Sequence, residues 1–139
     1  MKFLLTPELG RLATWLRAVG YDASIFQGSI PDLLAKATFE KRIVVTRQGA
    51  LRGHRGTPVV RIAHDRVEKQ LLELKKSCRI RLSPSALFHQ CLRCNVPVEP
   101  ITKNQVKKKV PPYVFKTQKA FSHCPVCRRI YWTATHWDR

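Results

Sequence analysis

The chain has 139 residues, of which 44% are hydrophobic, and it carries 26 Lys and Arg against 9 Asp and Glu. This apolar content excludes a disordered tail, and the length allows one ordinary domain, or a domain of about 85 residues with a small second one. A net charge of +17 repels itself in a compact chain and therefore predicts a polyanionic partner. Nucleic acid is the first expectation and a membrane surface is discounted, because no run is long enough to span a bilayer and no basic helix has a wide apolar face.

The first 77 residues have the pattern of alternating short strands and helices. Apolar runs predict strands at 2–5, 22–26, 43–46 and 58–63, and helical spacings predict helices at 7–19, 30–41 and 65–77. Thr6 is expected to cap the first helix and Gly20 to end it. The third helix is expected to place Val67, Leu71, Leu72 and Leu74 on its buried face. This order predicts a three-layer α/β domain around a mostly parallel sheet.

The string RIVVTRQG (residues 42–49) runs from an apolar strand into a basic turn that contains glycine. Ligands of parallel sheets gather at the carboxyl ends of the strands, so Thr6, the loop 27–32 and the loop 46–49 are expected on one rim. A carboxylate at such a strand end commonly holds a metal, yet the turn offers Gln48. The rim is either a catalytic edge without its acid or a surface for binding phosphate.

Composition changes after about residue 79, and we divide the chain into an α/β domain over 1–85 and a small domain over 86–139. The second part contains two Cys-x2-Cys motifs, Cys91/Cys94 and Cys124/Cys127, separated by 29 residues. Two such knuckles predict a four-cysteine zinc site that is closed and therefore structural. Unrelated reduced cysteines or a redox pair are the alternative, and Cys78 is expected to be a bystander.

Between the knuckles lies the string KNQVKKKVPPYVFKTQK (residues 103–119), which reads as a basic, hairpin-like insert with six Lys. Its lysines are expected to contact phosphates, whereas Tyr113 and Phe115 either stack on bases or pack on the ribbon. The residues predicted to bind RNA are Arg47, Arg52, Arg55, Lys103, Lys107, Lys108, Lys109, Lys116 and Lys119.

Three strings together, FLLTPELGRLATWLRAVGYDA, RIVVTRQGAL and the ribbon CLRCNVPVEP…CPVCRRIYWTATHW, resemble the mut-seven C-terminal RNase family over nearly the whole chain. The resemblance implies a PIN-like three-layer α/β sandwich with a C-terminal zinc ribbon. It also implies RNA cleavage that depends on Mg²⁺ or Mn²⁺ held by acids at the strand ends. It implies Asp at the positions of Thr6 and Gln48, and its third acidic position fits Asp32.

The favoured hypothesis is an RNA-binding protein on this ribonuclease scaffold, catalytically impaired because Thr6 and Gln48 replace two acids. Structured RNA such as tRNA or rRNA is the expected target, since charge is spread over both parts of the chain. The alternative is an active Mg²⁺- or Mn²⁺-dependent endoribonuclease that uses Asp32 and Glu8, with Asp65 as a third acid.

A weaker alternative is an adaptor that docks a ribosome or an enzyme through an apolar patch of Tyr131, Trp132 and Trp137. For any of these functions we expect a cytoplasmic protein, because the first residues do not have the pattern of a secretory signal. A reducing compartment also favours metal ligation over disulfides for the cysteines.

Overall fold

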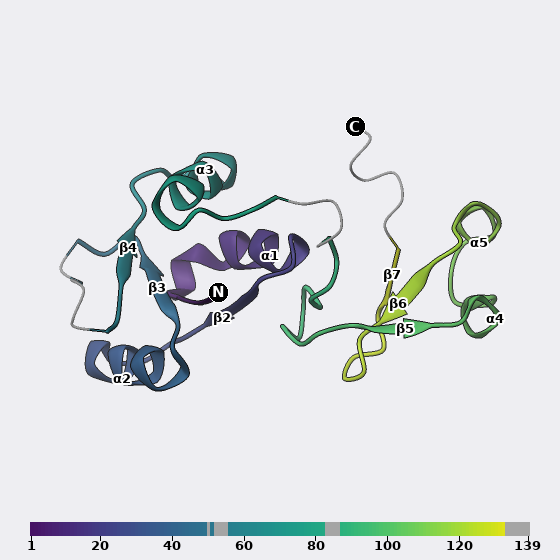
Figure 1. Ribbon diagram of the computed structural model, residues 1–139, viewed down its shortest axis with the longest axis horizontal. Coiled ribbons are helices and arrows are strands. Elements are labelled where there is room, and N and C mark those ends of the chain that lie inside the picture. Colours follow the sequence, from purple (N-terminus) through teal and green to yellow (C-terminus); the bar gives the residue numbers. More distant parts are fainter. Residues whose placement is uncertain (50, 52–55, 83–86, 133–139) are drawn as a thin grey trace.

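The computed structural model describes residues 1–49, 51, 56–82 and 87–132. They form a larger α/β unit and a smaller unit that lies beside the end of α1 (Figure 1). The elements of the first unit are β1 (Lys2–Leu5), α1 (Gly10–Ala18), β2 (Asp22–Ile25), α2 (Ile30–Glu40), β3 (Ile43–Thr46), β4 (Val59–Arg61) and α3 (Val67–Cys78). The alternation of strands and helices is as predicted.

The first unit is built on a parallel four-stranded sheet with the order β2-β1-β3-β4. Side chains alternate between its two faces, as the pleat of a strand requires. Phe3 and Leu5 belong to the core under α1 and α3, whereas Leu4 packs with Leu33 of α2 on the other face. Helices therefore cover both faces, and the mostly parallel sheet that the sequence predicted is confirmed (Figure 1).

The helix boundaries follow from local sequence. The Ser29 hydroxyl accepts the Asp32 N–H at 3.2 Å and caps α2, and Gly20, with φ of 98°, takes the left-handed conformation that ends α1. Thr6 behaves differently from the prediction. A 3-10 turn, Pro7–Leu9, precedes α1, and the Thr6 hydroxyl makes no capping bond; it donates to the Glu8 side chain.

Helix α3 begins at Val67, and the predicted inward positions of Val67, Leu71 and Leu74 are confirmed. Leu72 is 57% exposed, so its predicted inward position is wrong, whereas Gln70 is only 5% exposed. The buried stripe runs through Val67, Gln70, Leu71 and Leu74 at i, i+3, i+4 and i+7. Gln70 is tolerated inside because its amide donates to the His64 carbonyl at 2.9 Å.

The second unit consists of an antiparallel sheet and a helical insert. Its elements are β5 (Glu99–Ile101), α4 (Lys103–Val106), α5 (Pro112–Thr117), β6 (Phe121–His123) and β7 (Ile130–Tyr131). The insert, which was expected to be hairpin-like, forms the two short helices instead, because Val106, Val110 and Val114 bury a small core against Phe121. A second cluster surrounds the cysteines.

The two units meet where the first cysteine knuckle contacts the beginning of β2 and the end of α1. Asn95 Oδ1 accepts the Ala23 N–H at 2.9 Å, and Asn95 Nδ2 donates to Asp22 Oδ1 at 2.7 Å. Arg17 donates to the carbonyls of Ala23 and Leu92, both at 2.8 Å. These contacts lie at the end of the parallel sheet opposite the carboxyl ends of its strands.

No helix in the described ranges is both long and apolar enough to cross a membrane.

Candidate functional site

The rim at the carboxyl ends of β1 and β3 is centred on two buried threonines, Thr6 and Thr46. Because these strands are neighbours in the sheet, the two hydroxyls come within 3.1 Å of each other. The Thr46 hydroxyl also accepts the Gln48 N–H at 3.0 Å and so fixes the following turn. Sequence reasoning placed Thr6 and the loop 46–49 on one rim but did not predict the contact between the Thr6 and Thr46 hydroxyls, which depends on the register of β1 and β3.

Glu8 is the carboxylate that reaches this rim, and its Oε1 is occupied by hydrogen bonds. Oε1 accepts the Thr6 hydroxyl at 2.6 Å and the Arg47 N–H at 3.3 Å. Partial burial of the carboxyl opposes ionisation, but these bonds and the nearby Arg47 charge outweigh it and lower the pKa of Glu8 below its usual value. Glu8 is therefore an anion, and one of its two carboxylate oxygens is already hydrogen-bonded within the protein.

Beside Glu8, an open pocket of about 300 Å³ lies between the start of α1 and the start of α3. Its charged lining residues are Glu8, Arg11, Asp65, Arg66 and Glu68. Their carboxylates do not converge: over the described ranges, the only group of three or more His, Cys, Asp or Glu side chains close enough to hold a metal is the cysteine quartet.

Asp32, the third predicted acid, does not line this pocket. It is exposed in the first turn of α2, which covers the face of the sheet opposite α1 and α3. Its backbone N–H is bound by Ser29. Glu8 and Asp65 thus line one pocket, whereas Asp32 lies on α2, which covers the opposite face of the sheet.

The strand-end rim continues at β4. Arg47 donates to the Ala63 carbonyl at 3.4 Å, and the Glu73 carboxylate accepts the backbone N–H groups of Ala63 at 3.0 Å and His64 at 2.8 Å. Glu73 also pairs with the His64 ring, so His64 is held by a carboxylate of α3. The predicted RNA-binding residues Arg52 and Arg55 lie outside the described residues.

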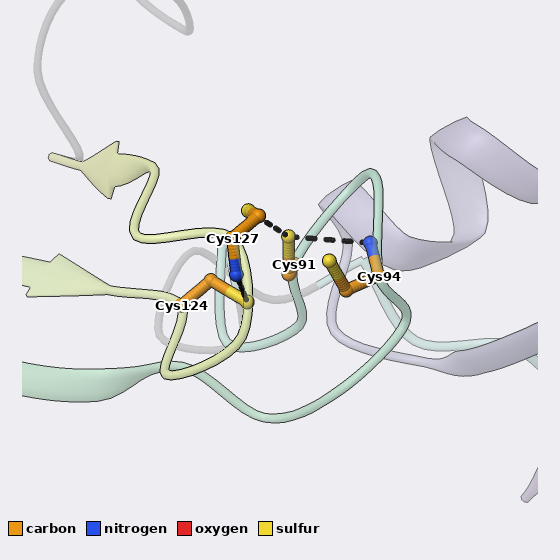
Figure 2. Close-up of side chains that lie close together, drawn as sticks. All are labelled: Cys91, Cys94, Cys124 and Cys127. Carbon is orange, nitrogen blue, oxygen red and sulfur yellow. Dashed lines mark hydrogen bonds between the residues drawn. The ribbon is translucent and has the colours of Figure 1, made fainter.

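The second candidate site is the cysteine quartet (Figure 2), in which all four sulfur atoms lie within 4.8 Å of one another. The Sγ atoms of Cys91 and Cys127 are 3.7 Å apart. A tetrahedral zinc ion with Zn–S bonds of about 2.3 Å separates its ligands by about 3.8 Å, so the spacing fits. Within each knuckle, a backbone N–H points at the first sulfur: Cys94 N at Cys91 Sγ (3.3 Å) and Cys127 N at Cys124 Sγ (3.4 Å).

The electrostatics of the quartet favour a cation. Burial disfavours the Cys91 thiolate, but hydrogen bonds from the Tyr131 hydroxyl and from backbone N–H groups outweigh burial and lower the pKa of Cys91 to about 6. Burial and the neighbouring sulfurs raise the pKa of Cys94 to about 12. Four crowded thiols cannot all ionise without positive charge at their centre, and a divalent cation supplies it. The site can therefore hold a metal such as zinc.

The remaining predicted contacts lie on the insert. Lys107, Lys108, Lys109, Lys116 and Lys119 are exposed, and Lys103 lies 4.8 Å from the centre of the Phe115 ring. Phe115 packs on the insert's core, whereas Tyr113 is exposed.

The apolar patch expected for an adaptor is not formed as predicted. Tyr131 is buried beside Cys91, and Trp132 packs edge-on against Phe121 with ring centres 6.4 Å apart. Trp137 lies outside the described residues.

Comparison with protein families shows that residues 1–139 match the model described as the Mut7-C RNAse domain. The chain belongs to this family. The resemblance found in the sequence strings is thereby confirmed for the whole chain, and membership indicates a ribonuclease-like or RNA-related function with RNA as the partner class. Searches of curated proteins and of solved structures found no match.

Proposed function

We propose that this protein binds RNA on a PIN-like ribonuclease scaffold whose metal-dependent cleavage is impaired. The observation that supports it is the hydroxyl pair Thr6–Thr46 at the rim, with Glu8 tied to Thr6 and to the Arg47 backbone. The metal-dependent cleavage that the family resemblance implies relies on carboxylates that hold a hard divalent cation beside the scissile phosphate. Thr6 and Gln48 supply neutral oxygens where the family resemblance implies Asp.

The loss of negative charge also changes what the rim can bind. With Arg47 exposed at the end of β3 and Arg61 exposed at the end of β4, the rim favours holding a phosphate. The six lysines of the insert provide a second cationic surface. Structured RNA such as tRNA or rRNA fits this arrangement best, since it can reach both surfaces at once. Zinc at the cysteine quartet is assigned a structural role, because four thiolates leave no open position.

The test uses full-length protein loaded with zinc, mixed in excess with an end-labelled structured RNA, with and without Mn²⁺. We expect a gel shift with intact RNA in every lane. The affinity should fall by on the order of 10³ between about 50 and about 200 mM salt, because each phosphate contact releases counterions. A matched double variant, Thr6→Asp with Gln48→Asp, restores both carboxylates and is expected to gain cleavage that requires Mn²⁺. RNA affinity that barely responds to salt would contradict the proposal.

Active cleavage is the second candidate, because two of the acids that it would use, Glu8 and Asp65, line one pocket. If wild-type protein cuts RNA only with Mn²⁺, and Glu8→Gln or Asp32→Asn abolishes the cut, the carboxylates present suffice. The impaired-enzyme proposal would then be rejected. Lys69→Gln, an exposed change on α3 outside that pocket, serves as the control for unspecific loss of activity.

A further inference from the structure

We propose that Tyr113 and the lysines around it form a platform on which unpaired bases of the bound RNA stack. This proposal rests on the proposed RNA-binding function and adds a ligand class to it: single-stranded segments, such as loops and ends, as opposed to duplex. Two features of the insert support it, namely the exposure of the Tyr113 ring and the absence of Asp and Glu from residues 103–119.

The insert folds without help from Tyr113. Its core consists of Val106, Val110 and Val114 packed against Phe121. The insert's other aromatic residue, Phe115, joins this core and carries the Lys103 ammonium over its ring. The structural role open to an aromatic residue here is therefore filled by Phe115, and Tyr113 is free for another.

Tyr113 lies in the first turn of α5 with 70% of its surface exposed. Its backbone carbonyl accepts the Thr117 hydroxyl at 2.7 Å, which fixes the local helix. Among the described residues its side chain has no bonding partner. A tyrosine side chain has only two torsion angles, so it loses little conformational entropy when a base stacks on its ring. Such stacking contributes about 1–3 kcal/mol per base.

The charge around the ring suits a phosphate backbone. Residues 103–119 contain six Lys and no Asp or Glu. Lys116 follows Tyr113 by three positions, so the two lie on the same side of α5, and Lys108 and Lys109 lie between α4 and α5. Single strands are held in this way, by cations that follow the phosphates and rings that take the bases. Duplex hides its base faces and can use only the cations.

A second exposed aromatic residue provides a matched control. Phe39 is 90% exposed on α2, in the α/β unit and outside the insert, where an acid, Glu40, follows it directly. If exposed rings merely bind RNA unspecifically, changing Phe39 should matter as much as changing Tyr113. If the platform is specific, only the ring among the lysines should matter.

The experiment measures fluorescence anisotropy of two labelled probes, an oligouridine of about 12 nucleotides and a blunt RNA duplex of the same length. The proteins are zinc-loaded full-length wild type, Tyr113→Leu, Tyr113→Phe and Phe39→Leu, each checked by circular dichroism and zinc content. We expect Tyr113→Leu to weaken oligouridine binding by about 5- to 100-fold and to leave duplex binding nearly unchanged. Tyr113→Phe, which keeps the ring, and Phe39→Leu should bind both probes like wild type.

The possible failures can be told apart. If wild type binds neither probe, the proposed RNA-binding function is wrong and the platform falls with it. If wild type binds both probes and Tyr113→Leu binds them equally well, the RNA function stands and the platform is rejected. An equal loss for single strand and duplex also rejects it, since stacking on unpaired bases requires a difference between them. Lys108→Gln with Lys109→Gln should weaken both probes.

Discussion

Tyr131 shows how a single hydroxyl can adjust the cysteine quartet. The residue is buried, with its ring stacked on Phe88 at 6.0 Å, and its hydroxyl lies 3.2 Å from Cys91 Sγ while accepting the Leu92 N–H at 3.0 Å. Burial and the nearby Cys91 sulfur raise the pKa of Tyr131 to about 12, so the hydroxyl stays protonated and donates a hydrogen bond to the sulfur. Sequence reasoning placed Tyr131 on an exposed patch and missed this contact, because nothing in the string marks a tyrosine as a neighbour of a metal ligand.

Replacing Tyr131 with Phe should weaken metal binding in a pH-dependent way. In wild type, hydrogen bonds hold the pKa of Cys91 at about 6 instead of the usual 9.0. The Cys91 thiolate therefore contributes its full share to the free energy of unfolding above pH 9.0. This contribution declines as the pH falls and is lost below about 6. Without the hydroxyl the pKa rises, so a proton competes with the metal already at neutral pH. We expect zinc affinity at pH about 7 to fall by about tenfold, measured by competition with a chromogenic chelator.

The pH at which half of the zinc is lost should likewise move upward in Tyr131→Phe. Tyr113→Phe, which removes a hydroxyl from an exposed tyrosine outside the cluster around the cysteines, is the matched control and should release zinc at the wild-type pH. Equal zinc release by Tyr131→Phe and wild type across the acidic range would show that the hydroxyl does not support the thiolate.

At the scale of elements, the first knuckle acts as a cover for the edge strand β2. An edge strand presents unpaired N–H and C=O groups that invite pairing with other chains. Here Asn95 accepts the Ala23 N–H, and Arg17 donates to the Ala23 carbonyl. The second knuckle has the same turn, with Asn95 and Arg128 in corresponding left-handed positions directly after Cys94 and Cys127. The structure gives the Arg128 side chain no such contact with β2.

This symmetry allows a matched pair of variants, Asn95→Gly and Arg128→Gly. Glycine keeps the positive φ of each turn without strain, so only the side chain is lost. In zinc-loaded protein, Asn95→Gly should speed hydrogen exchange of the Ala23 amide by at least about fivefold, the equivalent of one hydrogen bond of about 1 kcal/mol. Exchange at Val45, inside the sheet, should not change. Ala23 protection that is equal in the two variants would show that the knuckle does not cover the edge.

The elements themselves were largely predictable, because each rests on a local pattern. Alternating and helical spacings located β1, β3 and α2, and the two Cys-x2-Cys spacings predicted the quartet. The errors arose where a particular side-chain hydrogen bond decides. Gln70 is buried, and Leu72 exposed, because the Gln70 amide donates a hydrogen bond to the His64 carbonyl. The Thr6 hydroxyl makes hydrogen bonds with Glu8 and Thr46 and does not cap the helix. Asn95 carried no signal at all, since its partners Asp22 and Ala23 are more than 70 positions away.

At the scale of the whole molecule, the two cationic surfaces lie at opposite ends. The rim occupies the carboxyl edge of the sheet, whereas the knuckle contacts the start of β2, and α4 and α5 lie beyond it (Figure 1). An RNA that contacts both surfaces must therefore extend along the molecule. The relative position of the two surfaces depends on the docked knuckle, and the knuckle's own shape depends on its sulfur ligands. We therefore expect metal binding, the docking of the second unit and the distance between the two cationic surfaces to be linked.

Metal removal from the full-length chain should consequently separate the units without unfolding the first. The α/β unit has two hydrophobic clusters of its own, formed around residues such as Phe3 and Val44. The clusters of the second unit are smaller, and one of them is centred on the cysteines. Small metal-bound units derive most of their folding free energy from the metal. After chelation we expect fast hydrogen exchange throughout 87–132 and at Ala23, continued protection of Val44, and weaker binding of structured RNA. Loss of protection at Val44 would mean that the two units fold as one, and a ribbon that stays protected would mean that its sulfurs need no metal.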